Sequence, residues 1–282
     1  MNKNIMWQKA LGKSIVYIGI LLFALLWIMP FILLGNTSAK DFGEANDPTE
    51  FLKIAKSFHV SNYTEAYETM DTSTAFFVTL AITIVSNISI IFVSSLAAWQ
   101  LARSKKLYAK IIFYGFIIAL IIPFQSIMFT LFKLVENLHL LNFLGMVILY
   151  TGFGLALSTF MMHGFISSIP TSLEEVAKVE GYGPLRTYFK IVLPLLKPII
   201  TTIVILNTMW IWNDFLLPYL FTIKNPEAPS TLIVNLYSKV SQFVSNPAVQ
   251  TAALVIVVLP VLVFFVIAQK NIISGITSGS VK

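Results

Sequence analysis

Cysteine is absent from the 282 residues of this sequence, which excludes disulfide bonds and thiolate metal sites. Charged residues are scarce too. They make up 11% of the chain, against about 25% in soluble domains. Hydrophobic residues make up 57%, more apolar surface than a soluble core can absorb. The composition therefore predicts a polytopic membrane protein.

Motifs for catalysis and for nucleotide binding are also missing. The three histidines are scattered without the spacing of metal ligands. Gly12-Lys13-Ser14 resembles the end of a phosphate-binding loop, but Trp7 stands where that motif requires glycine. No paired carboxylates and no nucleophile with a base accompany the apolar runs. We therefore expect no metal site, no ATP site and no enzymatic activity in this chain.

Long apolar runs are abundant. Six of them reach 20 to 23 residues, and a helix needs about 20 residues to cross about 30 Å of hydrocarbon. They are residues 15–34, 76–98, 111–132, 143–162, 199–221 and 249–268. Because the alternating pattern of a β-barrel is missing, we predict an all-α membrane protein with six transmembrane helices. Pro30, Pro123, Pro218 and Pro260 each favour a kink or a helix end within a run.

The distribution of lysine and arginine predicts the orientation. If both termini face the cytoplasm, that side holds 13 Lys and Arg in 76 residues, and the opposite side holds 6 in 78. The positive-inside rule therefore predicts cytoplasmic termini. The first run exceeds the apolar core of a signal peptide, so we expect an uncleaved helix. This bias accounts for the pI of 9.4, and we expect membrane lipid and no nucleic acid as partner.

The polar segments divide the chain into three parts. Residues 41–71, here called the acidic segment, hold seven acidic residues and two lysines. Within this segment, residues 49–57 are predicted to form a short surface helix. We expect residues 1–71 to supply an N-terminal tail, the first span and the acidic segment. Residues 72–270 would form the transmembrane domain and residues 271–282 a C-terminal cytoplasmic tail.

The polar loop, residues 163–198, carries the signals of two short helices. Thr171 and Ser172 are suitable N-caps, and each has a glutamate three residues later, at Glu174 and Glu175. Gly181 is placed to end the first helix in the left-handed conformation, and Pro184 to begin the second. Two apolar stripes are predicted on these helices: Leu173, Val176 and Ala177 on the first, and Leu185, Tyr188, Phe189 and Val192 on the second. Amphipathic helices lying on the membrane surface are the alternative interpretation.

Asp214 is the only charged residue inside the six runs. A carboxylate within the bilayer is costly, so it is a functional candidate by default. Alternatively, it binds backbone donors where the helix breaks before Pro218. Aromatic rings and amides suit a sugar, although tryptophan is also common at membrane interfaces. The predicted substrate pathway comprises Gln125, Trp212, Asn213 and Asp214.

One spacing in the polar loop resembles a known family. Glutamate, two small residues, then glycine, isoleucine and Leu-Pro at fixed distances mark the loop of bacterial ABC importer permeases. Glu175, Ala177, Gly181, Ile191, Leu193 and Pro194 match it, and Val176 replaces its first alanine. Ser168-Ile169-Pro170, Trp212-Asn213-Asp214-Phe215, Asn62-Tyr63 and residues 275–282 resemble the carbohydrate group. Within that group, the chain is similar to the six-span permeases related to the smaller subunit of the maltose transporter.

The resemblance implies a type I ABC importer permease fold and roles for the polar loop. Its helices would dock in a groove of a cytoplasmic ATPase, with Glu175 facing a basic residue of that ATPase. Gly181 would permit the bend and Ala177 a close approach. Ile191, Leu193 and Pro194 would anchor the second helix to the membrane domain. The predicted coupling set is Glu174, Glu175, Ala177, Gly181, Ile191, Leu193 and Pro194.

The same resemblance implies the partners and the location. They are a second related permease, an ATPase dimer that binds ATP and Mg²⁺, and an external sugar-binding protein that contacts residues 222–248. The chain itself would hold no cofactor and would lie in a bacterial cell membrane. The expected substrate is a sugar, in particular an oligosaccharide; a polyol or glycerol phosphate is the alternative. An ion-coupled secondary transporter is the rival class, but one intramembrane Asp and no repeat argue against it.

Overall fold

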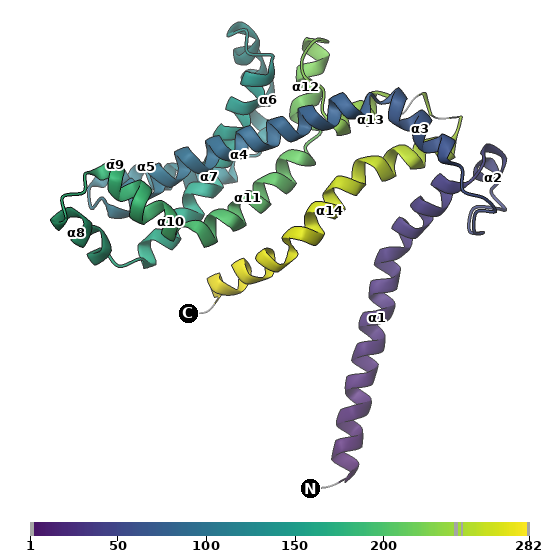
Figure 1. The fold of residues 1–282 in the computed structure, drawn as a ribbon, viewed down its shortest axis with the longest axis horizontal. Coiled ribbons are helices and arrows are strands. Elements are labelled where there is room, and N and C mark those ends of the chain that lie inside the picture. Colours follow the sequence, from purple (N-terminus) through teal and green to yellow (C-terminus); the bar gives the residue numbers. More distant parts are fainter. Residues whose placement is uncertain (1–2, 240–241, 244, 281–282) are drawn as a thin grey trace. The chain divides into compact units, whose positions relative to one another are not determined.

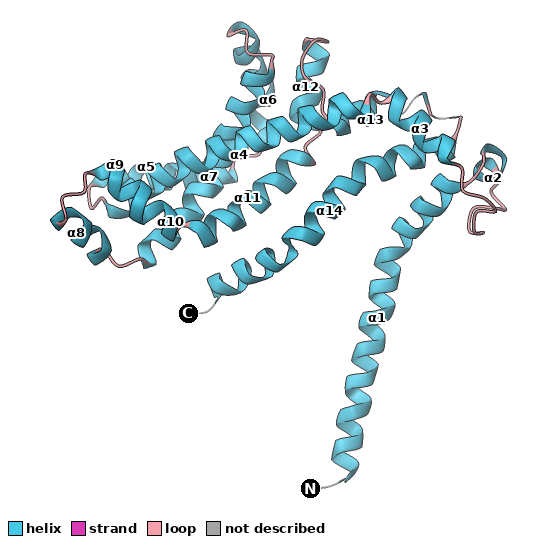
Figure 2. Ribbon diagram, in the orientation of Figure 1, coloured by secondary structure: helices cyan, strands magenta, loops and turns pink. Residues whose placement is uncertain are grey.

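The computed structural model describes residues 3–239, 242–243 and 245–280, and this part of the chain contains helices and loops without a strand (Figures 1 and 2). It forms two compact units. The first comprises Met1–Asp71 with Leu236–Leu259, and the second comprises Thr72–Asn235 with Pro260–Lys282. The division falls within α13 (Leu232–Lys239) and α14 (Pro247–Ser280). Each unit is described by itself.

The first unit is built on α1 (Lys3–Ala39), which contains one candidate membrane span, Val16–Ala39. Large apolar side chains are exposed along this helix from Val16 to Ile32, as expected for a surface that meets lipid or another membrane protein. Pro30 lies inside this continuous helix. The helix therefore does not end at Pro30, one of the two outcomes that the sequence predicted there.

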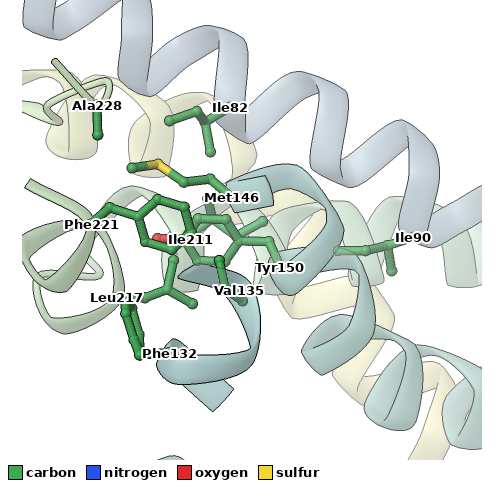
Figure 3. Packing of buried hydrophobic residues seen from close by; sticks show 10 residues of the cluster. All are labelled: Ile82, Ile90, Phe132, Val135, Met146, Tyr150, Ile211, Leu217, Phe221 and Ala228. Atoms are coloured by element: carbon green, nitrogen blue, oxygen red, sulfur yellow. The ribbon is translucent and has the colours of Figure 1, made fainter. Parts of the chain in front are cut away.

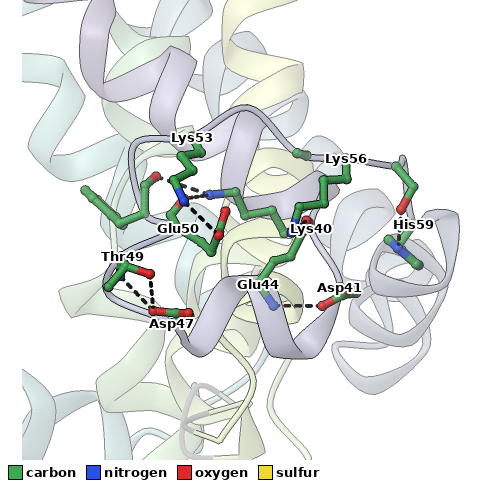
Figure 4. Close-up of polar contacts among 12 residues, drawn as sticks. Lys40, Asp41, Glu44, Asp47, Thr49, Glu50, Lys53, Lys56 and His59 are labelled. Carbon is green, nitrogen blue, oxygen red and sulfur yellow. Dashed lines mark hydrogen bonds and ion pairs between the residues drawn. The ribbon is translucent and has the colours of Figure 1, made fainter.

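The acidic segment folds around Lys40, which is 1% exposed. Its ammonium donates to the backbone carbonyls of Glu50 and Phe51 (Figure 4). Directly after Lys40, Asp41 caps the short helix α2 (Phe42–Asn46): its carboxylate accepts the Glu44 N–H at 2.7 Å. The buried Lys40 ammonium and the Glu44 N–H thus have partners, as buried polar groups in ordered segments usually do.

The predicted helix at residues 49–57 is wrong, because these residues form turns and bends. The Asp47 carboxylate accepts both the N–H and the hydroxyl of Thr49 at 2.8 Å (Figure 4). Such local side-chain bonds compete with helix formation. The hydrogen bonds from Thr49 also lower the pKa of Asp47. The Glu44 carboxylate likewise raises the pKa of Lys56 through their hydrogen bond.

Asn62 and Tyr63, on α3 (Val60–Thr69), tie that helix to the end of α1. The Asn62 amide donates to the carbonyls of Ser38 at 3.0 Å and Lys40 at 2.8 Å. The Tyr63 hydroxyl lies 2.6 Å from the Ser38 hydroxyl. The Asn-Tyr pair that resembles the carbohydrate permeases therefore has a local structural role in closing the acidic segment.

The second unit is a bundle around α4 (Thr72–Arg103) and α7 (Phe143–Ser168), which pack along each other (Figure 1). Both α5 (Leu107–Ile121) and α11 (Lys197–Trp212) pack against this pair. Small polar side chains allow the close approach of α4, as is common between membrane helices. The fully or nearly buried ones are Thr79, Thr83, Ser86, Ser94 and Ser95. The Asn87 amide donates to the Thr208 hydroxyl on α11 at 3.2 Å, so it bonds a neighbouring helix.

One apolar core lies where residues of α4, α6 (Phe124–Asn137), α11 and α12 (Leu216–Lys224) meet α7 (Figure 3). Tyr150 and Met146 of α7 pack with residues of α6 and α12. The rings of Phe132 and Phe221 meet edge to face at 5.4 Å. This core fixes the two helices that continue beyond the breaks in the third and fifth apolar runs.

Among the residues that the structure describes, four helices are long and apolar enough to span a membrane, and up to six spans result if each bent helix pair is one span. The third predicted run, residues 111–132, is not a single helix, because α5 and α6 meet at 104°. Pro123 causes this break as predicted, since it lacks an N–H and keeps Ile122 extended at ψ 115°. The fifth run, residues 199–221, is also interrupted, between α11 and α12. Pro260 lies inside α14 without ending it.

Candidate functional site

The polar loop contains two helical arms, as predicted. The first is α8 (Ser172–Val179), and the second comprises α9 (Pro184–Thr187), the π-helix η1 (Tyr188–Val192) and α10 (Leu193–Leu195). Pro184 opens the second arm. The predicted side-chain cap of the first arm is wrong. Thr171 is helical at φ −65° and ψ −23° and makes no capping bond, because its backbone already continues the helical turn.

The bend between the arms depends on Gly181, which has φ +81°. The Tyr182 N–H donates to the Ala177 carbonyl at 2.9 Å, and the Gly181 N–H donates to the Lys178 carbonyl at 3.1 Å. This pair of bonds is a Schellman motif, which a residue in the left-handed conformation completes. The Arg186 guanidinium lies over the Tyr182 ring at 4.0 Å. The predicted left-handed glycine is confirmed.

The two predicted apolar stripes are only partly correct, because each arm divides its apolar residues between two faces. Ala177, Tyr188 and Val192 are buried, and the last two pack in the core of the bundle. The other four residues of the predicted stripes are exposed: Leu173 by 43%, Val176 by 58%, Leu185 by 71% and Phe189 by 52%. Val179, at the end of the first arm, is 89% exposed. An exposed apolar group of this kind next to polar residues is typical of a surface that binds another protein.

The two glutamates of α8 have different surroundings. The Glu174 carboxylate accepts the Trp99 indole N–H at 3.0 Å and forms an ion pair with Arg103 at 2.9 Å. Arg103 also donates to the Ile169 carbonyl at 3.0 Å. Glu175 is exposed, and its carboxylate has no hydrogen bond or ion pair within the described residues. Glu174 is thus occupied inside the chain, whereas Glu175 is available to a partner.

The residues expected to anchor the second arm differ in burial. Leu193 is half-buried and packs against the cluster formed by Ala98, Met162, Ile166, Tyr188, Val192, Leu196 and Ile203. Pro194 is exposed in the short helix α10. The Leu193 N–H donates to the Tyr188 carbonyl, a π-type bond of the kind often found at functional sites. Tyr188 and Val192, rather than Pro194, provide the buried contacts of this arm.

A second candidate site is a cavity of about 470 Å³ in the second unit. Its walls come from the ends of α5 and α6 and from α7, α11 and α12. Gln125 and Asp214 line it, as do Asn207 and Trp210. Cavities of about 300–1,000 Å³ with few polar groups are typical of small-molecule sites. Its remaining lining is largely apolar.

Two residues of the predicted pathway lie elsewhere. Trp212 is 8% exposed and packs against Phe76, with ring centroids 5.6 Å apart. Asn213 donates to the carbonyl of Met209 at 2.7 Å. Neither lines the cavity. Asn207 was missed, and Trp210, although close to Asp214 in sequence, was left out of the predicted pathway. The spacing of 207, 210 and 214 would place all three on one face of a continuous helix.

Asp214 uses both of its carboxylate oxygens. One accepts the Tyr150 hydroxyl at 3.0 Å, and the other accepts the Leu216 N–H at 3.1 Å. The second bond supports the alternative interpretation of this residue, a carboxylate that satisfies a backbone donor where the helix breaks. Tyr150 also meets Trp210 edge to face at 5.5 Å. Asp214 therefore shapes the cavity wall as well as the helix break.

Metal binding has no support in the described residues, where no group of three His, Asp or Glu could hold an ion.

Residues 90–278 match the family described as binding-protein-dependent transport system inner membrane component. The chain belongs to this family. This permease has a relative in Thermoanaerobacterium thermosulfurigenes, "Probable starch degradation products transport system permease protein AmyC". The two are 38% identical over 95% of this chain and 96% of the relative.

A further relative is the "Melibiose/raffinose/stachyose import permease protein MelC" of Bacillus subtilis (strain 168), 35% identical over 90% of this permease and 91% of the relative. A solved bacterial ABC transporter "involved in the import of the acidic polysaccharide alginate" shares the fold. The two structures match with a TM-score of 0.78 at 19% sequence identity, and the match covers 96% of this chain and 98% of the solved chain. The all-α fold predicted from the apolar runs and the ABC importer permease fold implied by the resemblance are therefore confirmed.

Membership of the family determines the general setting of this permease. It is a multi-pass protein of the cell membrane and the non-enzymatic component of an ABC importer. An ATPase and a binding protein are its general partners, and ATP hydrolysis belongs to partner subunits. The resemblance found in the polar loop is confirmed at this level.

Proposed function

We propose that this permease imports a sugar, in particular an oligosaccharide, into the cytoplasm by alternating access. The observation that carries the proposal is the near full-length similarity to permeases named for starch degradation products and for melibiose, raffinose and stachyose. A polyol or glycerol phosphate has less support. ATP binding to the partner ATPases opens the membrane domain outward, and hydrolysis resets it.

The proposed orientation places both termini and the polar loop in the cytoplasm. The excess of Lys and Arg, 13 against 6 on nearly equal lengths, supports it. We infer a heterodimer with a second, related permease. The exposed apolar surface of α1 supports this inference, since neighbouring membrane helices bury such surface. ATP and Mg²⁺ bind to the partner ATPase, and this chain holds no cofactor.

The polar loop is the proposed docking element for the ATPase. Glu175 supplies a carboxylate to a basic residue, and the exposed apolar side chains Val176, Val179 and Leu185 enter the groove. Gly181 sets the angle between the arms. Interfaces of this kind combine an apolar centre with a polar rim. Tyr188, Val192 and Leu193 hold the second arm against the bundle in this proposal.

The cavity is the proposed part of the sugar pathway. Trp210 presents an aromatic face, and Gln125 and Asn207 present amides. These groups match the C–H faces and the hydroxyls of a sugar. Asp214 contributes through the break between α11 and α12. Trp212 and Asn213 belong to the fixed part of this break rather than to the surface offered to the sugar.

The function is tested by reconstitution. The permease is placed in liposomes together with the second permease and the ATPase, with the cytoplasmic face toward the lumen. A binding protein loaded with radiolabelled maltotriose is then added to the external solution. We expect uptake only with ATP inside and loss of uptake without the ATPase subunits. Uptake driven by a proton gradient without the ATPase would contradict the proposal and favour a secondary transporter. Equal competition by glycerol phosphate would contradict the sugar assignment.

Filling the cavity gives a sharper test of the pathway. Leu157 lines the cavity on α7, so Leu157→Trp places a bulky ring inside it. We expect sugar uptake to fall at least about tenfold while ATP hydrolysis continues, because a route through such a site requires free volume. Ile148→Trp is the control, since Ile148 is exposed on the same helix outside the cavity. Equal uptake by both variants would show that sugar does not pass through the cavity.

A further inference from the structure

Three side chains on α4 meet both arms of the polar loop. Ser95, Trp99 and Arg103 follow one another at intervals of four residues, so they share one face of the helix. We call them the α4 stripe. The stripe reaches the last residue of α4, next to the loop.

The first arm is held by charge. Glu174 of α8 accepts hydrogen bonds from both Trp99, at 3.0 Å, and Arg103, at 2.9 Å. The carboxylate is 18% exposed and the Arg103 side chain 20%. Arg103 also bonds the carbonyl of Ile169, just before α8. Charge-assisted bonds of this kind are about twice as strong as neutral ones, so the start of the arm is fixed to α4.

The second arm is held by a buried hydroxyl pair. Tyr188 of η1 is 1% exposed, and its hydroxyl lies 2.6 Å from the Ser95 hydroxyl. The Trp99 ring also packs on the Tyr188 ring, with centroids 5.8 Å apart. Trp99 therefore contacts both arms, one through its N–H and the other through its ring.

We propose that the α4 stripe couples the polar loop to the membrane domain, so that α4 moves with both arms as one body during the transport cycle. Ser95, Trp99 and Arg103 are positioning residues in this proposal, which rests on the proposed function. Glu175 and the exposed apolar side chains bind the ATPase, whereas Glu174 and Tyr188 pass the displacement to α4. Of the two adjacent glutamates, Glu175 thus contacts the ATPase and Glu174 contacts α4.

The first experiment exchanges the charges of the ion pair in the reconstituted transporter. Arg103→Glu and Glu174→Arg alone should retain the ATPase on purification, because the docking surface is unchanged. Sugar imported per ATP hydrolysed should fall at least about tenfold. The double variant should recover to within about threefold of the wild type, since it restores opposite charges. Lys110→Glu is the control, because it removes the same charge at an exposed position outside the stripe.

A second measurement keeps the proposal testable if charge reversal prevents folding. Because this chain has no cysteine, spin labels can be placed at Ile88→Cys on α4 and at Ser172→Cys on α8 without background from this chain. Ser172 is exposed and lies outside the proposed docking residues. We expect the distance between the two labels to stay constant, within about 2 Å, between nucleotide-free and ATP-bound transporter. Tyr188→Phe should broaden the distribution of this distance and lower the amount of sugar imported per ATP hydrolysed about threefold.

The outcomes separate the two proposals. If the wild type shows no ATP-driven uptake, the proposed function fails and the coupling role falls with it. If the wild type is active, two results overturn the coupling role alone. One is that the variants lose folded protein but keep an unchanged ratio of sugar to ATP. The other is a change in the label distance of several ångström between nucleotide states.

Discussion

Replacing Gly181 with valine should strongly reduce ATP-driven transport while leaving the permease inserted in the membrane. Gly181 has φ +81°, and an L-residue in the left-handed conformation costs about 1–2 kcal/mol, with β-branched residues at the unfavourable extreme. A cost of 1–2 kcal/mol changes a conformational population by about 5–30-fold. Loss of the bend misplaces Glu175 relative to the second arm, so we expect uptake to fall at least about tenfold.

Two further variants isolate the backbone as the cause. A Cβ at Gly181 meets no atom within 4 Å, so a steric clash is not involved. Gly181→Asn should retain uptake to within about threefold, because asparagine tolerates the left-handed region. Gly183→Val is the matched control, since Gly183 also has open space around it and an ordinary φ of −73°. Its extended backbone before Pro184 suits a β-branched residue.

Co-purification of the ATPase and the hydrolysis stimulated by loaded binding protein are the measurements. The Gly181→Val transporter should lose both, or keep the ATPase and lose stimulation. Unchanged stimulation in this variant would mean that the bend is not required for docking. Glu175→Lys provides an independent test of the same surface, with loss of ATPase binding expected because the carboxylate partner becomes repulsive.

The local signals of the polar loop were readable from the sequence because each depends on residues close along the chain. Gly181 and Pro184 act through their own φ angles, and the structure places them as predicted. The roles of the adjacent glutamates were not readable. Glu174 is 71 residues from Arg103 in sequence, so nothing near it in the chain announces an inward contact. Arg103 was interpreted only as one of the charges that orient the protein.

The membrane runs show the same limit. Hydropathy finds the six runs because burial in lipid requires about 20 apolar residues, but it does not reveal where a helix turns. Pro123 gave that information for the third run. In the fifth run, Asn213 and Asp214 mark the break, and the helix register decides which tryptophan faces the cavity. Trp210 and Asp214 both line the cavity, whereas Trp212 packs on Phe76.

The largest effect on folding is expected at Gly145, in the first turn of α7. A Cβ built there would lie 1.7 Å from the carbonyl oxygen of Leu140 and 2.8 Å from its carbonyl carbon. The approach is tight because His139 turns the chain at φ +56° and the Asn142 side chain accepts the Gly145 N–H at 3.1 Å. A backbone atom cannot change rotamer to avoid the clash. Gly145→Ala must therefore shift the turn or the helix.

Overpacking typically costs about 1–3 kcal/mol and occasionally more, and a rigid backbone contact belongs at the upper end. In purified permease we expect a midpoint of thermal unfolding lower by several degrees, at about 2–4 °C per kcal/mol. Gly152→Ala on the same helix is the control, because its Cβ meets nothing within 4 Å. It should leave the midpoint within about 1 °C or raise it, since alanine favours a helix by roughly 0.5–1 kcal/mol. Equal midpoints for both variants would show that the turn yields without cost. A selective loss would show that this turn fixes the start of α7, and with it Tyr150 and the hydrogen bond that holds Asp214 at the cavity.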